Sequence, residues 1–435
     1  MAASVHVVGA GLAGSECAWQ LARRGVPVVL HEMRPGRSTP AHATGRFAEL
    51  VCSNSLRSDE PTHAAGLLKR EMETFDSLVI GAAREHAVPA GGALAVDRER
   101  FAAAITARLE ALPGVEIRRE EVTALPDGDV VIATGPLGSP AISQLLAELC
   151  GGEHLYFYDA IAPIVDGDSL DFGAMFAASR YGKGEGDDYW NAPFDRDGYT
   201  AFHRAIVEAE VVPLHDFEQN LFFEGCLPIE ELARRGVDTL RYGPMKPVGL
   251  VAPDGRRPWA VVQLRHESLA REQFNLVGFQ SRMKWPDQQR VFRTIPGFAN
   301  AEFSRLGQVH RNTFVNAPRA LDALYRVKRE PRVRLAGQIT GVEGYLESAA
   351  TGLAVALYLA RERRGEPPAA LPATTALGAL ARHLTESDPE RFQPANINYG
   401  LFPPLEPEPK KRERRAALAA RAFADLEAWR RACAA

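Results

Sequence analysis

The stretch VHVVGAGLAGSECAWQLARRGVPVVLHE, residues 5–32, decides the fold. Its pattern predicts a short apolar strand, a glycine turn, a helix and a second apolar strand. Gly9, Gly11 and Gly14 form G-x-G-x-x-G directly after the first strand, and Glu32 closes the second. In such a turn the first glycine permits the tight bend, the second lets a pyrophosphate approach the backbone, and the third lets helix and sheet pack closely. An acid at the position of Glu32 suits a ribose hydroxyl. The stretch predicts a dinucleotide site, and an S-adenosylmethionine fold, which can carry the same features, is the alternative.

Two later segments repeat the pattern of an apolar strand followed by glycine. They are DVVIATGP, residues 129–136, and VRLAGQITGVEGYLESAATGLAVALYLARER, residues 333–363, which continues into a helix. Three such junctions, spread over the chain, predict one nucleotide-binding sheet assembled from distant segments. The residues predicted to bind the cofactor at the three junctions are Gly9, Ala10, Gly11, Leu12, Ala13, Gly14, Glu32, Gly135, Gly337, Gln338, Ile339 and Gly341.

The residues between the second and third junctions are richer in aromatic side chains and loops, which indicates an inserted, smaller α+β domain. The predicted organisation is a first part of the nucleotide-binding domain at 1–160, the insertion at 161–300 and a second part at 301–405. A proline-rich link and a basic C-terminal helix follow at 406–435.

Composition restricts the class of protein. The net charge of the 435 residues is -4, so no overall basic field indicates nucleic acid, although local patches can still bind it. The 5 cysteines are odd in number and include no CxxC pair, which argues against a disulfide framework and against a zinc site. A reducing cytoplasm is the simplest setting. The chain starts with a strand rather than a signal peptide, and prolines and glycine interrupt its longest uncharged run, so no membrane helix is expected.

The stretch FFEGCLPIEEL, residues 222–232, places Cys226 just ahead of an expected helix. Pro228 suits the first turn of a helix, and Glu230 and Glu231 match the positive end of the helix dipole. That position favours a thiolate, whereas the nearby Glu224 opposes one. From these residues alone, an activated thiol and a buried structural cysteine both remain open.

Seven segments together resemble the folate- and FAD-dependent tRNA uracil-5-methyltransferase family. They are GAGLAGSECAWQLA, HEMRP, FAELVCSNSLRS, FEGCLPIEELA, RYGPMKPVGL, GFQSRMKWPDQQRVFRTIPG and AGQITGVEGYLESAATG. The resemblance extends from Val5 to about Leu405 and leaves out the basic tail. It implies a glutathione-reductase-type α/β flavoprotein fold, with FAD held by the N-terminal glycine turn. It also implies a relation to the larger flavoproteins that modify wobble uridines.

The chemistry that the resemblance implies is methylation at C5 of the T-loop uridine of tRNA. Methylenetetrahydrofolate is the carbon donor, reduced FAD is the methylene carrier and reductant, and NADH or NADPH reduces the flavin again. By the same resemblance Cys226 is the nucleophile that adds to uracil C6, because that addition makes C5 an enolate-like carbon. Cys52 is assigned a role near C5 as acid, base or protecting partner of Cys226, with simple packing as the alternative.

Five residues are weaker candidates for substrate binding, namely His310, Lys246, Arg282, Lys284 and Trp285. The histidine either stacks on or hydrogen-bonds the folate pterin, or it is structural. The SRMKWP segment combines cations with an aromatic ring, which suits an RNA backbone and an unstacked base; a solvated loop beside a core tryptophan is the alternative. For Lys246 the same two alternatives apply, namely contact with RNA or a solvated position. The basic C-terminal helix is either a solvated surface helix or a contact to the tRNA backbone.

Two other functions remain open from the sequence. One is flavin-dependent modification of a wobble uridine together with a partner protein, and the other is a non-catalytic flavin-binding regulatory role. The EGC segment and the short chain favour uracil-5-methylation over the first of these. Two motif cysteines in separate segments disfavour the second. The sequence does not determine the oligomeric state, and a monomer is favoured.

Overall fold

The computed structural model describes residues 3–39, 41–151, 154–184, 186–213, 227–268 and 272–434. A six-stranded sheet carries all three glycine junctions. Its strands are, in spatial order, β16 (Arg326–Val327), β17 (Glu330–Leu335), β7 (Val130–Ile132), β1 (Val5–Val8), β2 (Val28–His31) and β6 (Val115–Arg118). Strands β17 to β6 are parallel, and β16 pairs antiparallel with β17. The predicted sheet from distant segments is confirmed, because β1, β7 and β17 are neighbours.

Helices α1 (Leu12–Arg23) and α11 (Tyr345–Arg363) follow β1 and β17 and pack against each other. Their backbones approach so closely that a Cβ atom at Gly352 would lie 2.1 Å from the carbonyl oxygen of Ala13. A three-stranded antiparallel sheet completes this part, with β3 (Ser55–Ser58), β5 (Ala93–Val96) and β4 (Ala87–Val88). The other helices of this part are α2 (Ala64–Glu73), α3 (Leu78–Glu85), α4 (Arg98–Glu110), α5 (Pro140–Cys150), α10 (Ala317–Ala320) and α12 (Ala376–Glu386).

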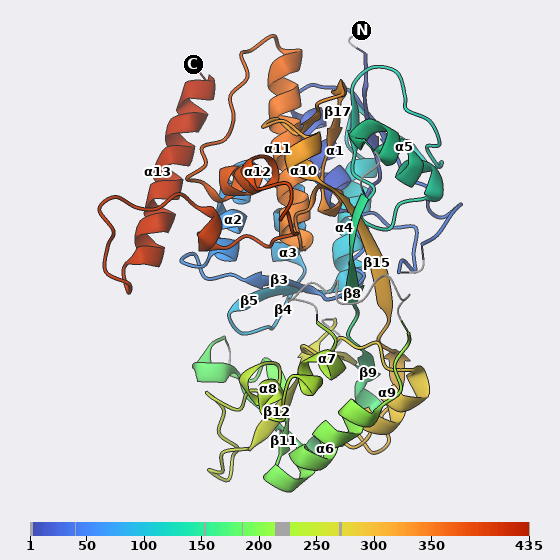
Figure 1. Ribbon diagram of the computed structural model, residues 1–435, viewed down its shortest axis with the longest axis vertical. Coiled ribbons are helices and arrows are strands. Elements are labelled where there is room, and N and C mark those ends of the chain that lie inside the picture. The colour runs from blue at the N-terminus through green and yellow to red at the C-terminus, as the bar shows by residue number, and fades with distance from the viewer. Residues whose placement is uncertain are drawn as a thin grey trace.

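A second sheet is antiparallel and lies below the first part in Figure 1. Its order is β10 (Phe176–Ala177), β11 (Tyr189–Phe194), β12 (Ala260–His266), β13 (Gln273–Leu276), β9 (Ile164–Asp166) and β14 (Phe303–Arg305). Helices α6 (Arg196–Glu208), α7 (Ile229–Arg234), α8 (Thr239–Tyr242) and α9 (Trp285–Phe292) accompany it. Strands β8 (His154–Ala160) and β15 (Val309–Val315) pair with each other and run between the two parts (Figure 1).

The buried apolar side chains form two main clusters. The larger draws on residues 5–146 and 314–426, and the smaller on residues 165–301. Each cluster belongs to one of the two six-stranded sheets. The inserted domain at 161–300 was predicted from the aromatic and loop content of the sequence, and it stays a proposal, which the separation of the two cores supports.

The C-terminal segment forms α13 (Arg414–Ala434). One face of this helix buries Leu418, Ala422 and Leu426 in the larger core, and α13 lies beside α2 in Figure 1. Arg414 and Arg415 at its start are exposed. The helix therefore packs by its apolar face and keeps basic residues in solvent.

Candidate functional site

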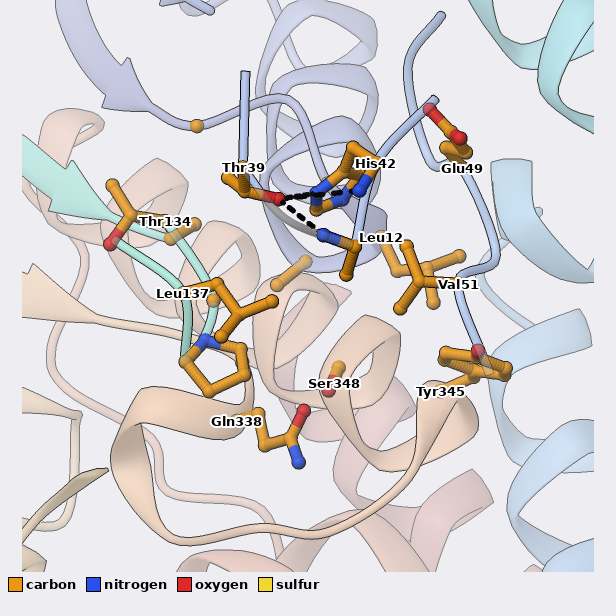
Figure 2. Close-up of a pocket in the computed structure, with 18 of the residues that line it drawn as sticks. Leu12, Thr39, His42, Glu49, Val51, Thr134, Leu137, Gln338, Tyr345 and Ser348 are labelled. Atoms are coloured by element: carbon orange, nitrogen blue, oxygen red, sulfur yellow. Dashed lines mark hydrogen bonds between the residues drawn. The ribbon is translucent and has the colours of Figure 1, made fainter. Parts of the chain in front are cut away.

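A cavity of about 380 Å³ lies at the carboxyl ends of β1, β2 and β7, where open α/β sheets bind their ligands (Figure 2). Its wall includes Gly9 after β1, Glu32 after β2 and Thr134 after β7. The lining also includes Cys52 and, at the start of α11, Tyr345. The cavity thus joins the predicted cofactor turns to one of the two predicted cysteines.

The N-terminal glycine turn has the geometry of a phosphate cradle. Gly9 has a φ of 98°, which favours glycine, and a Cβ atom at Gly14 would lie 1.8 Å from the carbonyl oxygen of Gly9. At Gly11 the same atom would meet nothing within 4 Å. Helix α1 has no side-chain cap at its N-terminus, so its first N–H groups are available to an anion. Gly9, Gly11, Leu12 and Ala13 line the cavity, whereas Ala10 and Gly14 belong to the same turn but are not among the lining residues.

Glu32 lines the cavity but already has hydrogen-bond partners. Its Oε1 accepts from Arg34 Nε at 2.9 Å and from the Arg34 backbone N–H at 3.0 Å, and its Oε2 accepts from the Ala10 N–H at 3.0 Å. Burial alone would raise the pKa of Glu32, but Arg34 and the backbone donors lower it overall. A second carboxylate, Glu49, accepts from the Arg34 Nη1 at 3.0 Å. Arg34 lies in the HEMRP segment and was not among the residues predicted to form the site.

The other two glycine junctions complete the cavity wall. Gly135 has a φ of 67°, a Cβ atom there would meet nothing within 4 Å, and the residue faces the cavity. Gly337 and Gln338 also line it, whereas Ile339 is buried and Gly341 packs against Phe392. The Oγ1 atom of Thr134 is buried without a hydrogen-bond partner in the part of the chain that the structure describes (Figure 2). These features fit a dinucleotide such as FAD. The glycine turn at the start of α1 leaves room for a pyrophosphate, and the Thr134 Oγ1 atom can hydrogen-bond to a ligand.

Cys52 lies at the wall of the cavity with its backbone held by Tyr345. The Tyr345 hydroxyl oxygen accepts hydrogen bonds from the Cys52 N–H at 2.6 Å and from the Ser53 N–H at 3.3 Å. Burial raises the pKa of Tyr345, so the phenol stays protonated at neutral pH. The Cys52 Sγ lies 3.8 Å from the carbonyl oxygen of Ala160. Cys226 lies outside the described residues. Tyr345 was missed as a site residue because nothing in its local pattern indicates which distant loop it meets.

Similarity to known proteins covers the whole chain. The family model described as GIDA, glucose inhibited division protein A, matches residues 4–367. A protein of Geobacter sulfurreducens named Methylenetetrahydrofolate--tRNA-(uracil-5-)-methyltransferase TrmFO is 56% identical over 431 residues, 99% of each chain. A Moorella thermoacetica protein of the same name is 57% identical over 432 residues, 99% of this chain and 98% of its own.

The chain belongs to the TrmFO family. The resemblance stated from the sequence motifs is thereby confirmed. Aquifex aeolicus GidA has a similar fold, with a TM-score of 0.69 at 16% identity over 98% of this chain and 73% of that chain. The predicted fold class, a FAD-type Rossmann architecture with a second smaller part, agrees with that of TrmFO and GidA proteins.

Four of the five predicted substrate-binding residues of this TrmFO family member are absent from the described lining of the cavity. Among the described residues that line it, Lys246, Arg282, Lys284 and Trp285 do not occur, whereas Gln280 does. Arg282 forms an ion pair with Glu231, and the Lys284 Nζ lies 2.6 Å from the Glu210 carboxylate. Trp285 is 55% exposed. His310 lies on β15, and its side chain lies outside the described part of the structure.

The described residues were also compared with the requirements of a metal site and of a membrane-spanning helix. Within the described ranges no group of three or more His, Cys, Asp or Glu side chains is arranged to hold a metal ion. In the same residues, no helix combines the length and the apolar character needed to cross a membrane.

Proposed function

We propose that the protein methylates C5 of the T-loop uridine of tRNA, with methylenetetrahydrofolate as the carbon donor and FAD as cofactor. The observation that carries the proposal is the position of Cys52 on the wall of the cavity formed by the glycine turns of β1, β7 and β17. Full-length similarity to proteins named TrmFO supports the choice of reaction. Reduced FAD, when bound, supplies the one-carbon transfer and the reducing equivalents.

The residues of the chain divide into cofactor and substrate roles. The backbone around Gly9 and Gly11, with the start of α1, holds the cofactor pyrophosphate. Glu32 faces the ribose. The thiolate of Cys226 adds to uracil C6 and raises the electron density at C5; this assignment rests on the sequence motif. Cys52 takes up the proton that C5 loses after it has gained the carbon. The C6–S bond breaks, with its electron pair returning to Cys226 as a thiolate, once the reducing equivalents have brought the carbon at C5 to a methyl group.

The remaining partners are assigned by the same proposal. NADH or NADPH reduces the flavin, and tRNA is the macromolecular substrate, approached through Lys246, Arg282, Lys284, Trp285 and His310. The basic start of α13 is a further candidate for tRNA-backbone contact. A reducing, cytoplasmic setting is consistent with Cys17, Cys150 and Cys433, which form no disulfide. A monomer is part of the same proposal.

Transfer of label tests this function. Purified protein is incubated with unmodified tRNA and NADH or NADPH, and with either methylene-labelled tetrahydrofolate or methyl-labelled S-adenosylmethionine. We expect a yellow protein with a flavin spectrum and label at a T-loop uridine from the folate alone. Label from S-adenosylmethionine alone would refute the flavin-dependent reaction, and label at the wobble position would favour the wobble-uridine reaction instead.

A further inference from the structure

The carbonyl oxygen of Cys52 accepts hydrogen bonds from two partly buried arginines. Arg98, at the start of α4, donates through Nη2 at 3.0 Å, and Arg305, at the end of β14, donates through Nη2 at 2.9 Å. Each guanidinium also holds the preceding backbone, since Arg98 donates to the Leu50 carbonyl and Arg305 to the Val51 carbonyl, both at 2.9 Å. These bonds use both lone pairs of the Cys52 carbonyl oxygen.

The two arginines differ in their charge partners. Arg98 forms an ion pair with Glu267, with 2.5 Å between Nε and Oε2. Across the residues that the structure describes, Arg305 forms no ion pair of its own. Burial and the neighbouring Arg98 lower the pKa of Arg305 to about 10, so it remains charged at neutral pH. Partial burial of the Arg305 charge costs free energy, because its hydrogen-bond partners are neutral backbone carbonyls. An apolar side chain could fill the same space without that cost.

The same loop is held by the second sheet at further points. The Asn54 side chain donates to the His266 carbonyl at 2.9 Å, and Arg265 donates to the Asn54 and Ser53 side chains at 2.8 and 2.9 Å. His266 ends β12, so these contacts and Arg305 all come from the second sheet. Tyr345 of α11 holds the two N–H groups on the other side of the loop.

We propose that Arg305 is a positioning residue for Cys52, through which the seating of the second sheet sets the direction of the Cys52 thiol at the cavity wall. Arg98 and Tyr345 bind the loop from the part that carries the glycine turns. From the second sheet, Arg265 binds the side chains of Asn54 and Ser53, whereas Arg305 supplies the charge-assisted hydrogen bonds to the backbone carbonyls of Val51 and Cys52. Without Arg305, we expect the loop to stay near its place in the fold, but the backbone of Cys52 loses the hydrogen bonds that fix its orientation. The effect on turnover rests on the proposed function; the effect on the loop does not.

The test compares Arg305→Ala with Arg293→Ala. Arg293 is a matched control, because its Nε and Nη2 donate to the backbone carbonyl of Ala301 at 3.2 and 3.1 Å, near the second sheet and away from Cys52. Hydrogen exchange of the Cys52 and Ser53 amides is measured first, with flavin content as a check on the cavity. We expect both amides to exchange several-fold faster than in wild type in Arg305→Ala, and at the wild-type rate in Arg293→Ala.

Turnover supplies the second readout. A displacement of about 1 Å can cost about 100-fold in rate, so we expect kcat of Arg305→Ala to fall about 10- to 100-fold, with the KM for tRNA nearly unchanged. Guanidinium ion, added below denaturing concentrations, should restore part of kcat and slow the amide exchange in Arg305→Ala only. Arg305→Lys, which keeps the charge but loses the fork, should lie between wild type and Ala.

The outcomes separate the two proposals. Unchanged exchange and unchanged kcat in Arg305→Ala would overturn the positioning role. Equal losses in Arg305→Ala and Arg293→Ala without guanidinium rescue would also overturn it, because they indicate general damage. If wild type transfers no methyl group, the proposed function fails, while the amide exchange and its rescue still decide the role of Arg305.

Discussion

Glu32 and Arg34 form a buried ion pair at the cavity wall, with 2.9 Å between Oε1 and Nε. Only 5% of the Glu32 side chain and 3% of the Arg34 side chain are exposed. Both carboxylate oxygens already accept hydrogen bonds from Arg34, and Oε2 also accepts from the Ala10 N–H. A ribose hydroxyl at this position must therefore share or displace a contact with Arg34. The Glu32 carboxylate therefore stabilises the glycine turn in addition to its proposed contact with the ribose.

Glu32→Gln should destabilise the protein and reduce its flavin content. Removing one partner of a buried ion pair costs about 3–5 kcal/mol, because the other charge stays buried without compensation. The lowered pKa of Glu32 means that its stabilisation is present above the pKa of an unfolded carboxyl group and is lost as the pH falls through the lowered value. Urea unfolding at several pH values should show a flatter acid limb in the variant. Equal stability of the two proteins at pH 7 would contradict the prediction.

Gly11→Val should lose FAD and keep its fold. The φ of Gly11 is -70°, and its added Cβ would meet no protein atom within 4 Å, so only a bound ligand is in the way. Gly14→Ala is the contrasting variant, because its Cβ would lie 1.8 Å from the Gly9 carbonyl oxygen and the turn itself must move. Flavin absorbance and thermal unfolding of the apoproteins distinguish the two. A Gly11→Val protein with full flavin content would place the phosphates elsewhere.

Glu71 should make stability fall as the pH rises toward 8. Its carboxyl group accepts from the N–H groups of Ala376 and Leu377 at the start of α12, and burial raises its pKa to about 8. Folding therefore favours the protonated acid. Its contribution is fully present below the unfolded value of about 4.3 and is lost as the pH rises through the folded value. The Tm of wild type should drop more from pH 5 to pH 8 than that of Glu71→Gln. Glu110→Gln on α4 is the control, and parallel pH profiles of wild type and Glu71→Gln would refute the assignment.

Trp285 should contribute more to tRNA binding than its neighbour Lys284. The indole is 55% exposed and can stack on an unpaired base, which is worth about 1–3 kcal/mol, or about 5- to 150-fold in affinity. Lys284 already pairs with Glu210, so a phosphate contact would only exchange one anion for another. Binding of tRNA to Trp285→Ala and Lys284→Ala is measured against salt concentration. A decrease of about 1 in the salt slope for Lys284→Ala would show that this lysine binds a phosphate after all.

The two motif cysteines should respond differently to tRNA that contains 5-fluorouridine. Fluorine at C5 cannot leave as a proton, so the thiol adduct at C6 persists on a denaturing gel. Unstacking the target base costs about a few kcal/mol and is common to all variants. We expect Cys226→Ala to retain FAD and tRNA binding while it loses methylation and the adduct. Cys52→Ala should lose turnover but can still form the adduct. An adduct that disappears with Cys52→Ala and survives Cys226→Ala would exchange the two roles.

Much of the fold could be predicted because its information is local. Residues 5–32 carry the alternation of strand, turn and helix together with glycines at the positions that need a positive φ or a close approach. The two later strand-to-glycine junctions repeat that pattern, so the assembly of β1, β7 and β17 into one sheet followed from sequence. The basic C-terminal helix was also foreseen, but the burial of Leu426 and its neighbours in the larger core was not. Amphipathic spacing marks an apolar face without naming its partner.

The sequence by itself determined the glycine turns, the parallel sheet and the family motifs that hold both cysteines. Only the tertiary structure decided what surrounds Cys52. Tyr345 lies 293 residues away in the chain, and Arg305 lies 253 residues away, yet both hold the Cys52 backbone. Likewise, Arg282 and Lys284 suggested free cations for RNA, but folding brought Glu231 and Glu210 to them. Backbone conformation depends on near neighbours, whereas the partner of a long polar side chain is set by how distant elements pack.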